Sequence, residues 1–215
     1  MSHGDGSEYP VLSVAPMIDV TDRHFRSFIR CISDAPVLWT EMTWDRAILY
    51  NAPEEPEYTL NKNRLPNGER QSLESIIGFS QEEHPVVMQL GGSNPEMLRR
   101  AAVHAIARGY DEINLNCGCP AQKRGKSRNN YGARLMFDPT LVAACCNAIR
   151  EAAAGTNVAV TVKCRLGVDE RDSYEQLQEF VETVSVAGIV HFIVHARKVR
   201  VEASPVRSRR SRAPQ

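Results

Sequence analysis

Glu112-Ile-Asn-Leu-Asn-Cys-Gly-Cys-Pro120 contains the clearest strand signal in the chain, followed at once by an unusual loop. Apolar and polar residues alternate from Ile113 to Asn116, which is typical of a β-strand. Gly118 and Pro120 then predict a sharp exit into a loop. In α/β proteins, chemistry is concentrated at the carboxyl ends of the strands. We therefore expect a functional site around the amides and thiols of this segment: Asn114, Asn116, Cys117 and Cys119.

The composition is that of a globular protein with a substantial core. The 215 residues are 42% hydrophobic and 24% charged, and no apolar run approaches the roughly 18 residues of a membrane helix. Residues 1–10 are polar and carry no targeting pattern, so we expect a flexible N-terminus and a cytoplasmic protein. The six cysteines show no CxxC pair or zinc-like spacing, which favours reduced, buried thiols and no bound metal.

The formal net charge of zero conceals an uneven distribution. Residues 197–215 hold seven basic residues and one acidic residue, whereas the rest of the chain holds 19 basic and 25 acidic residues. The segment 199–215 is rich in Arg, Ser and Pro. We expect it to be a disordered basic tail that follows a folded domain over residues 11–198.

Strand-like and helix-like segments alternate along the domain. We expect strands at 12–17, 36–42, 85–90, 113–116, 157–163 and 189–194. Helices are expected to begin near Thr21, Asn94, Asp138 and Tyr174, with one helical turn at 73–77 inside an otherwise irregular segment 51–84. This alternation predicts a parallel sheet, either a barrel or a doubly wound sheet. Polar residues end each strand and would meet at one face of a barrel: Asp19, Glu41, Gln89, Asn116, Lys163, Arg165, His195 and Arg197.

Considered singly, these residues leave alternatives open. Cys119, between Gly118 and Pro120, is either a nucleophile or proton donor or an inert loop thiol, whereas Cys117 is better explained as a small filler. Lys163 and His195 are either site residues or ordinary strand-end residues. Asn114 and Asn116 share one face, and a planar polar ligand could satisfy their amides. Neither GxxxxGK[ST] nor GxGxxG is present, which argues against nucleotide triphosphatases and dinucleotide-binding Rossmann domains.

Seven motifs together resemble the tRNA-dihydrouridine synthases, most closely the branch that acts on uridines 20 and 20a of the D-loop. They are Val14-Ala-Pro-Met17, Thr40-Glu-Met42, Gln89-Leu-Gly-Gly92, Asn114-Leu-Asn-Cys-Gly-Cys-Pro120, Gly132-Ala-Arg-Leu-Met136, Val162-Lys-Cys-Arg-Leu-Gly167 and Val194-His-Ala-Arg-Lys198. The resemblance implies a (β/α)8 barrel that uses NADPH to reduce FMN and then reduces uridine in tRNA to 5,6-dihydrouridine. It also leads us to expect a monomer that binds neither a metal nor a membrane.

The resemblance also implies roles for individual residues. Cys119 would be the catalytic acid that protonates C5 of the uracil, and Asn116 and Arg165 would bind the substrate. The residues expected to bind FMN are Pro16, Met17, Gln89, Lys163 and His195. Because Lys163 would lie near the N1/O2 edge of the reduced ring, it would offset the negative charge there.

The motifs end at Lys198, after about six of the eight β/α units of such a barrel. We expect a truncated or misread gene product, in which the segments that bind the flavin phosphate in relatives are missing; the alternative is that 199–215 is an RNA-binding arm. Two other functions stay open: a non-catalytic RNA-binding fragment with a vestigial site, and a flavin-dependent barrel enzyme that acts on a small molecule. The Asn-Cys-Gly-Cys-Pro loop argues against the latter.

Overall fold

The computed structural model describes residues 12–54, 71–120 and 131–201. Its centre is a six-stranded parallel sheet in the order β1-β3-β4-β5-β6, in which β2 also pairs with β3. The strands are β1 (Leu38–Trp39), β2 (Thr43–Trp44), β3 (Val86–Gly91), β4 (Glu112–Asn116), β5 (Ala159–Val168) and β6 (Phe192–Val199). The expected flexible N-terminus at 1–10 lies outside the described residues, as does 202–215 of the expected tail.

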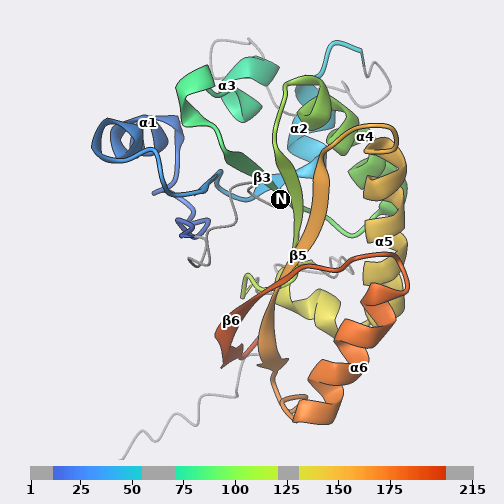
Figure 1. Cartoon of the computed structure of the whole chain (residues 1–215). Coiled ribbons are helices and arrows are strands. Elements are labelled where there is room, and N and C mark those ends of the chain that lie inside the picture. The colour runs from blue at the N-terminus through green and yellow to red at the C-terminus, as the bar shows by residue number, and fades with distance from the viewer. Residues whose placement is uncertain (1–11, 55–70, 121–130, 202–215) are drawn as a thin grey trace, which may run out of the picture.

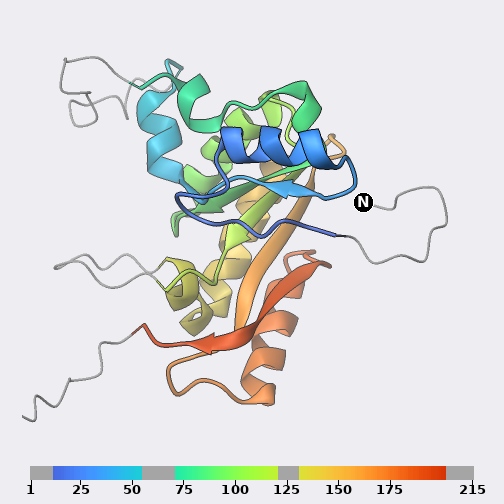
Figure 2. The same ribbon diagram turned by 90° about the vertical axis from the view of Figure 1, so that its left-hand side faces the viewer.

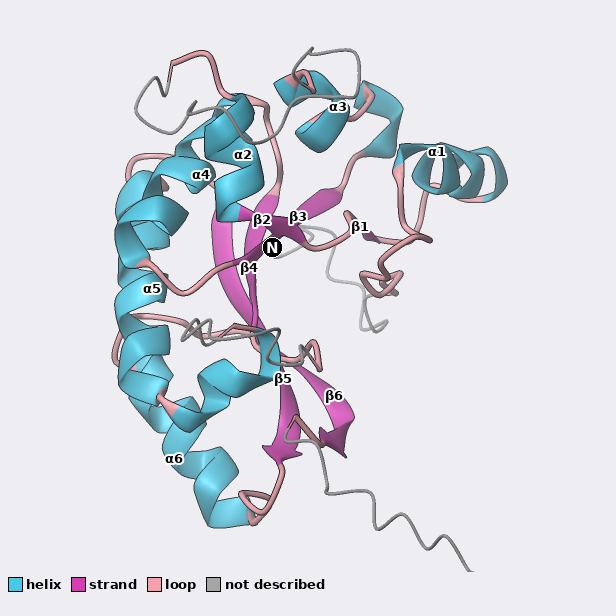
Figure 3. Cartoon of the chain, turned by 180° about the vertical axis from the view of Figure 1, so that it is seen from behind, coloured by secondary structure: helices cyan, strands magenta, loops and turns pink. Residues whose placement is uncertain are grey.

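Helices follow the strands and lie on the outer side of the curved sheet (Figures 1 and 3). They are α1 (Arg23–Ile32), α2 (Asp45–Asn51), α3 (Leu73–Ile77), α4 (Pro95–Ala107), α5 (Pro139–Ala152) and α6 (Tyr174–Ser185), with 3-10 turns η1 (Gln81–Glu83) and η2 (Gly132–Phe137). This arrangement is a partial (β/α)8 barrel, which confirms the barrel rather than the doubly wound sheet. None of the described helices has the length and apolar character that a bilayer crossing requires.

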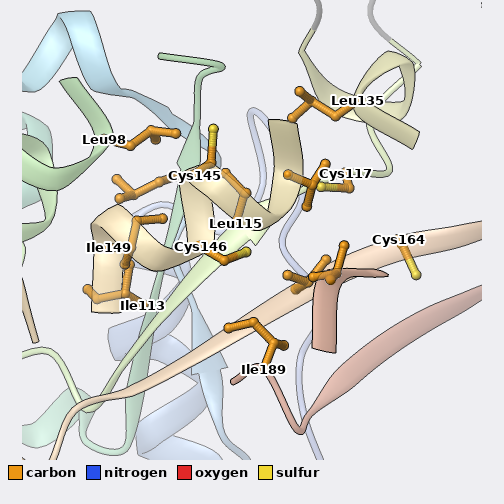
Figure 4. Close-up of a cluster of buried hydrophobic side chains, with 14 of the residues drawn as sticks. Leu98, Ile113, Leu115, Cys117, Leu135, Cys145, Cys146, Ile149, Cys164 and Ile189 are labelled. Atoms are coloured by element: carbon orange, nitrogen blue, oxygen red, sulfur yellow. The ribbon is translucent and has the colours of Figure 1, made fainter. Parts of the chain in front are cut away.

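The main core fills the space between the sheet and helices α4, α5 and α6 (Figure 4). Strand side chains alternate, so that Ile113, Leu115 and Cys117 from the β4 region face the helices while Asn114 and Asn116 face the barrel interior. All six cysteines are free: four are buried in this core, Cys119 is partly exposed and Cys31 is fully exposed. The expectation of mostly buried thiols is therefore confirmed, with Cys31 as the exception.

The first two expected strands are shorter in the structure. Instead of a strand at 12–17, only Ser13 bridges to Val37, because the described residues provide a partner on one side alone. The expected strand at 36–42 is divided into β1 and β2, both of which pair with β3 (Figure 2). The segment Pro36–Met42 was expected to form one strand, but Glu41 and Met42 interrupt the hydrogen-bonded ladder.

Two helical features also differ from expectation. Helix α2 was not expected at all, because Trp44 at its N-cap gives no side-chain capping bond and hence no sequence signal. Helix α1 is capped by Asp22, whose carboxylate accepts from Phe25 N at 2.8 Å, rather than by Thr21. Thr21 is fully buried and instead bonds the backbone of Met17.

The last two strands are displaced toward the C-terminus relative to the sequence estimate. β5 extends to Val168 and β6 to Val199, with a register irregularity between Arg165 and Gly167. Val199 and Val201 are buried in the main core, and Val201 N donates to Asp169 Oδ1 at 2.8 Å. Packed structure thus continues to residue 201, beyond the expected domain end at 198.

Candidate active site

A single cavity of about 500 Å³ lies at the carboxyl ends of the strands. Its walls include every residue to which the sequence resemblance gave a role: Pro16, Met17, Gln89, Asn116, Cys119, Lys163, Arg165 and His195. The other expected strand-end residues, Asp19, Glu41 and Arg197, do not line it. Residues separated by up to 179 positions in the sequence are therefore neighbours at one site, as the closure of parallel strands predicts.

Asn116 organises the loop that carries Cys119. Its Oδ1 accepts hydrogen bonds from Gly118 N at 3.1 Å and from Cys119 N at 2.9 Å, so the chain turns around this amide. Cys117 is fully buried against the helices (Figure 4), whereas Cys119 lines the cavity. The interpretation of Cys117 as a filler is confirmed, and the two thiols of the Cys-Gly-Cys motif have separate environments.

Gly132, which lies outside the Cys-Gly-Cys motif, supports the same loop. No property of this residue considered singly predicted that role. Ala133 N donates to Cys119 O at 2.9 Å, and Gly132 adopts φ +58°, a left-handed conformation that favours glycine. A Cβ atom at Gly132 would lie 2.4 Å from Cys119 O. The only sequence signal was a glycine at the start of the Gly132-Ala-Arg-Leu-Met136 motif, since nothing local shows which carbonyl it approaches.

Burial raises the pKa of the Cys119 thiol, while the nearby Arg165 charge acts in the opposite direction. Cys119 is therefore held as a neutral thiol at neutral pH, which is the form that can give up a proton. Arg165 also fixes the loop directly, because its Nε donates to Gly118 O at 2.9 Å. The Cys-Gly-Cys loop is thus held by two side chains, the amide of Asn116 and the guanidinium of Arg165.

The cavity is electropositive. Lys163, Arg165 and His195 line it, and no acidic side chain does so among the described residues. Burial, followed by repulsion from Arg165, lowers the pKa of Lys163. The charge of Arg165 is the main factor that lowers the pKa of His195, so this imidazole is neutral near pH 7. Such a cavity suits a planar ligand with negative charge at one edge.

The inward-facing amides find hydrogen-bond partners in one another, which leaves one N–H of Asn116 and one of Gln89 for a ligand. Asn116 Nδ2 donates to Gln89 Oε1 at 2.8 Å, Gln89 Nε2 donates to Asn114 Oδ1 at 2.9 Å, and Asn114 Nδ2 donates to Thr161 Oγ1 at 2.8 Å. Sequence periodicity placed these amides on one face but could not pair them across strands. Within the described residues, no group of three His, Cys, Asp or Glu side chains is placed to hold a metal ion.

Comparison with known proteins identifies a family that the chain matches. A family model described as dihydrouridine synthase matches residues 13–214, which extends beyond Lys198, where the motifs in the sequence end. Proteins named tRNA-dihydrouridine(20/20a) synthase are similar to this chain: 42% identical over 198 residues in Shewanella oneidensis, 44% over 203 in Synechocystis and 42% over 193 in Escherichia coli.

These alignments cover 92%, 94% and 88% of this chain, respectively. They cover 51%, 53% and 50% of the three relatives. The chain therefore spans about half the length of the curated relatives that it matches.

Proposed function

This chain belongs to the dihydrouridine synthase family, in the tRNA-dihydrouridine(20/20a) synthase branch, and we propose that its cavity reduces uridine in the D-loop of tRNA to 5,6-dihydrouridine with FMN and NADPH. The observation that carries the proposal is the convergence of Cys119, Asn116, Arg165, Lys163 and His195 on one cavity. Positions 20 and 20a are the proposed targets.

Two side chains are suited to hold the uracil. Asn116 uses one N–H of its amide within the protein, so the second can donate to a uracil carbonyl. Arg165 is fixed through Nε, and its other four N–H donors are on the terminal nitrogens, where they can bond uracil oxygens or the RNA backbone. The target base must leave the RNA stack to enter the cavity, as in other enzymes that act on bases.

Cys119 is the proposed proton donor. When bound and reduced by NADPH, FMN would supply the hydride for C6 of the uracil. The electron pair of the former C5–C6 double bond then takes a proton at C5, and the S–H bond of Cys119 breaks to provide it. Solvent restores the proton to the thiolate. The raised pKa of Cys119 supports this role, because the thiol remains protonated until the base requires it.

The FMN ring is proposed to lie against Pro16, Met17 and Gln89, with Lys163 and His195 at its charged edge. The fit rests on the electropositive lining and on Gln89, whose second amide N–H is available to a ring atom. In (β/α)8 barrels, phosphate binds after strands 7 and 8. We therefore propose that residues 11–198 supply the part of the pocket that holds the flavin ring. We also propose that the protein acts as a monomer in a reducing cytoplasm.

Anaerobic flavin titration and a tRNA assay test the proposal. The purified chain should bind FMN with a shift in the flavin absorption band, and with NADPH it should convert uridine to dihydrouridine in unmodified tRNA. Cys119→Ala should keep the flavin shift and lose about 10²–10⁴-fold in rate, as expected for removal of a general acid. The exposed Cys31→Ala is the matched control and should behave like the parent.

Two results would count against the proposal. A Cys119→Ala variant as active as the parent would exclude this thiol as the acid. A parent protein that binds tRNA without flavin or turnover would instead favour a non-catalytic RNA-binding fragment.

A further inference from the structure

The interior of this barrel is polar at a level where aliphatic side chains usually dominate. Gln89, Asn114 and Thr161 are register partners on β3, β4 and β5, so they form one layer, and each is at most 1% exposed. Asn116 lies above this layer toward the cavity, and Glu112 lies below it at the opposite end of β4. Valine or leucine at these positions would fill the space without any need for hydrogen-bond partners.

The five side chains form one directional chain of hydrogen bonds. Every donor points away from the Cys119 loop: Asn116 donates to Gln89, Gln89 to Asn114, Asn114 to Thr161, and the Thr161 hydroxyl to Glu112. Each of the three amides accepts a hydrogen bond at its oxygen and donates one from its nitrogen, so none of them can turn over without breaking at least two bonds.

Both ends of the chain fix its direction. At the upper end, the backbone N–H groups of Gly118 and Cys119 can only donate, so Asn116 must present its oxygen to them. At the lower end, the Thr161 hydroxyl accepts from Asn114 and donates its proton to Glu112, which is 7% exposed.

We propose that Glu112 and Thr161 are positioning residues that act through Asn114 and Gln89 to fix the orientation of Asn116 and, with it, the loop that carries Cys119. Their relevance to catalysis rests on the proposed function, but their effect on the loop does not. The chain leaves Asn116 one defined N–H for the substrate and holds the thiol at the cavity wall. Glu112 would thus influence the site from the other end of the same strand.

Paired variants of the full chain separate positioning from packing. Thr161→Val keeps the volume but removes the hydroxyl, and Thr161→Ser restores it. Glu112→Leu removes the acceptor and places an aliphatic side chain in the interior, whereas Glu112→Gln keeps an acceptor oxygen. Glu112→Leu leaves the buried Thr161 hydroxyl without its acceptor, so it should unfold at somewhat lower urea than the parent, by about 1–3 kcal/mol.

The readout is iodoacetamide alkylation of each cysteine, followed by peptide mass spectrometry, which needs neither flavin nor tRNA. In Thr161→Val and Glu112→Leu, Cys119 should react about fivefold faster or more, since each variant breaks the chain. Thr161→Ser and Glu112→Gln should stay near the parental rate. Cys31, exposed on α1, and Cys145 with Cys146, on the buried side of α5, should keep their rates in all four variants.

The possible results are distinguishable. Unchanged Cys119 reactivity in both chain-breaking variants overturns the proposal. Faster alkylation of Cys145 and Cys146 together with Cys119 also overturns it, because the effect is then general loosening. Faster Cys119 alkylation with rescue by serine or glutamine supports positioning, and it does so even if the protein forms no dihydrouridine, which would refute the proposed function alone.

Discussion

Replacement of Gly132 by alanine should loosen the Cys119 loop, although Gly132 lies outside the Cys-Gly-Cys motif. Alanine at φ +58° costs about 1–2 kcal/mol, because the left-handed region crowds a Cβ atom. That Cβ would lie 2.4 Å from Cys119 O and displace the bond from Ala133 N, which costs about 1 kcal/mol more. The free energy of unfolding should therefore fall by about 2–3 kcal/mol.

Gly118→Ala is the matched control within the motif itself. Its φ is not in the left-handed range, and an added Cβ would meet Arg165 and the Cys164 backbone at 3.6 Å, an ordinary contact. Alanine also reduces the entropy of the unfolded chain, so this variant should be unchanged or more stable by about 0.4–1 kcal/mol. The two glycines are thus expected to respond with opposite signs.

Urea unfolding and thiol alkylation measure the difference. Gly132→Ala should unfold at lower urea than the parent, and a loop weakened by 2 kcal/mol should open about thirtyfold more often, which would speed alkylation of Cys119 accordingly. Gly118→Ala should not unfold earlier than the parent. Equal unfolding midpoints for the two variants, or a parental Cys119 rate in Gly132→Ala, would refute the steric reasoning.

Three further outcomes are expected. Lys163→Met should weaken FMN binding about tenfold or more in a fluorescence titration, because a half-buried cation is lost from the cavity, and an unchanged Kd would remove Lys163 from the flavin site. Arg26→Met should destabilise the fold by about 3–5 kcal/mol in urea, since it leaves the 1% exposed Glu83 carboxylate without its partner at 2.5 Å, and the added change Glu83→Leu should recover most of the loss. Burial raises the pKa of Glu112 above its usual 4.5, with Thr161 and His191 opposing, so the folded state binds this proton more tightly than the unfolded state. The stability of the parent relative to Glu112→Gln should therefore fall as the pH rises from 4.5 through that raised pKa. If the difference in urea midpoint between the two proteins is the same at both ends of this pH range, the shift is contradicted.

Local sequence signals predicted the helices that begin at a capping side chain followed by proline. Asn94 and Asp138, each followed by proline, predicted the starts of α4 and α5, and both side chains cap their helices as expected. Helix α2 and the division between β1 and β2 were missed, because they depend on pairing with β3 and on packing against α4 rather than on a local signal.

Packing also decided what the apolar stripe of α1 does. In the sequence, Phe25, Phe28, Ile29 and Ile32 recur at helical spacing, which predicts one buried face. In the structure, however, Phe28 is 62% exposed and Ile32 66% exposed. Periodicity shows that a helix has an apolar side, but it does not show whether the described residues cover it. The same limit applies to Val190, which precedes β6, and to Val194 within β6, both of which are exposed.

The sequence by itself determined that strands and helices alternate along the chain, and its family motifs indicated a barrel and the polar residues that line its cavity, because strand periodicity and family motifs are local properties of the chain. Only the tertiary structure decided how those residues are held. The separation of Cys117 from Cys119, the approach of Gly132 to Cys119 O and the direction of the chain from Asn116 to Glu112 all depend on contacts between strands and loops distant in sequence. Such contacts are fixed by register and backbone proximity, which no single stretch of sequence specifies.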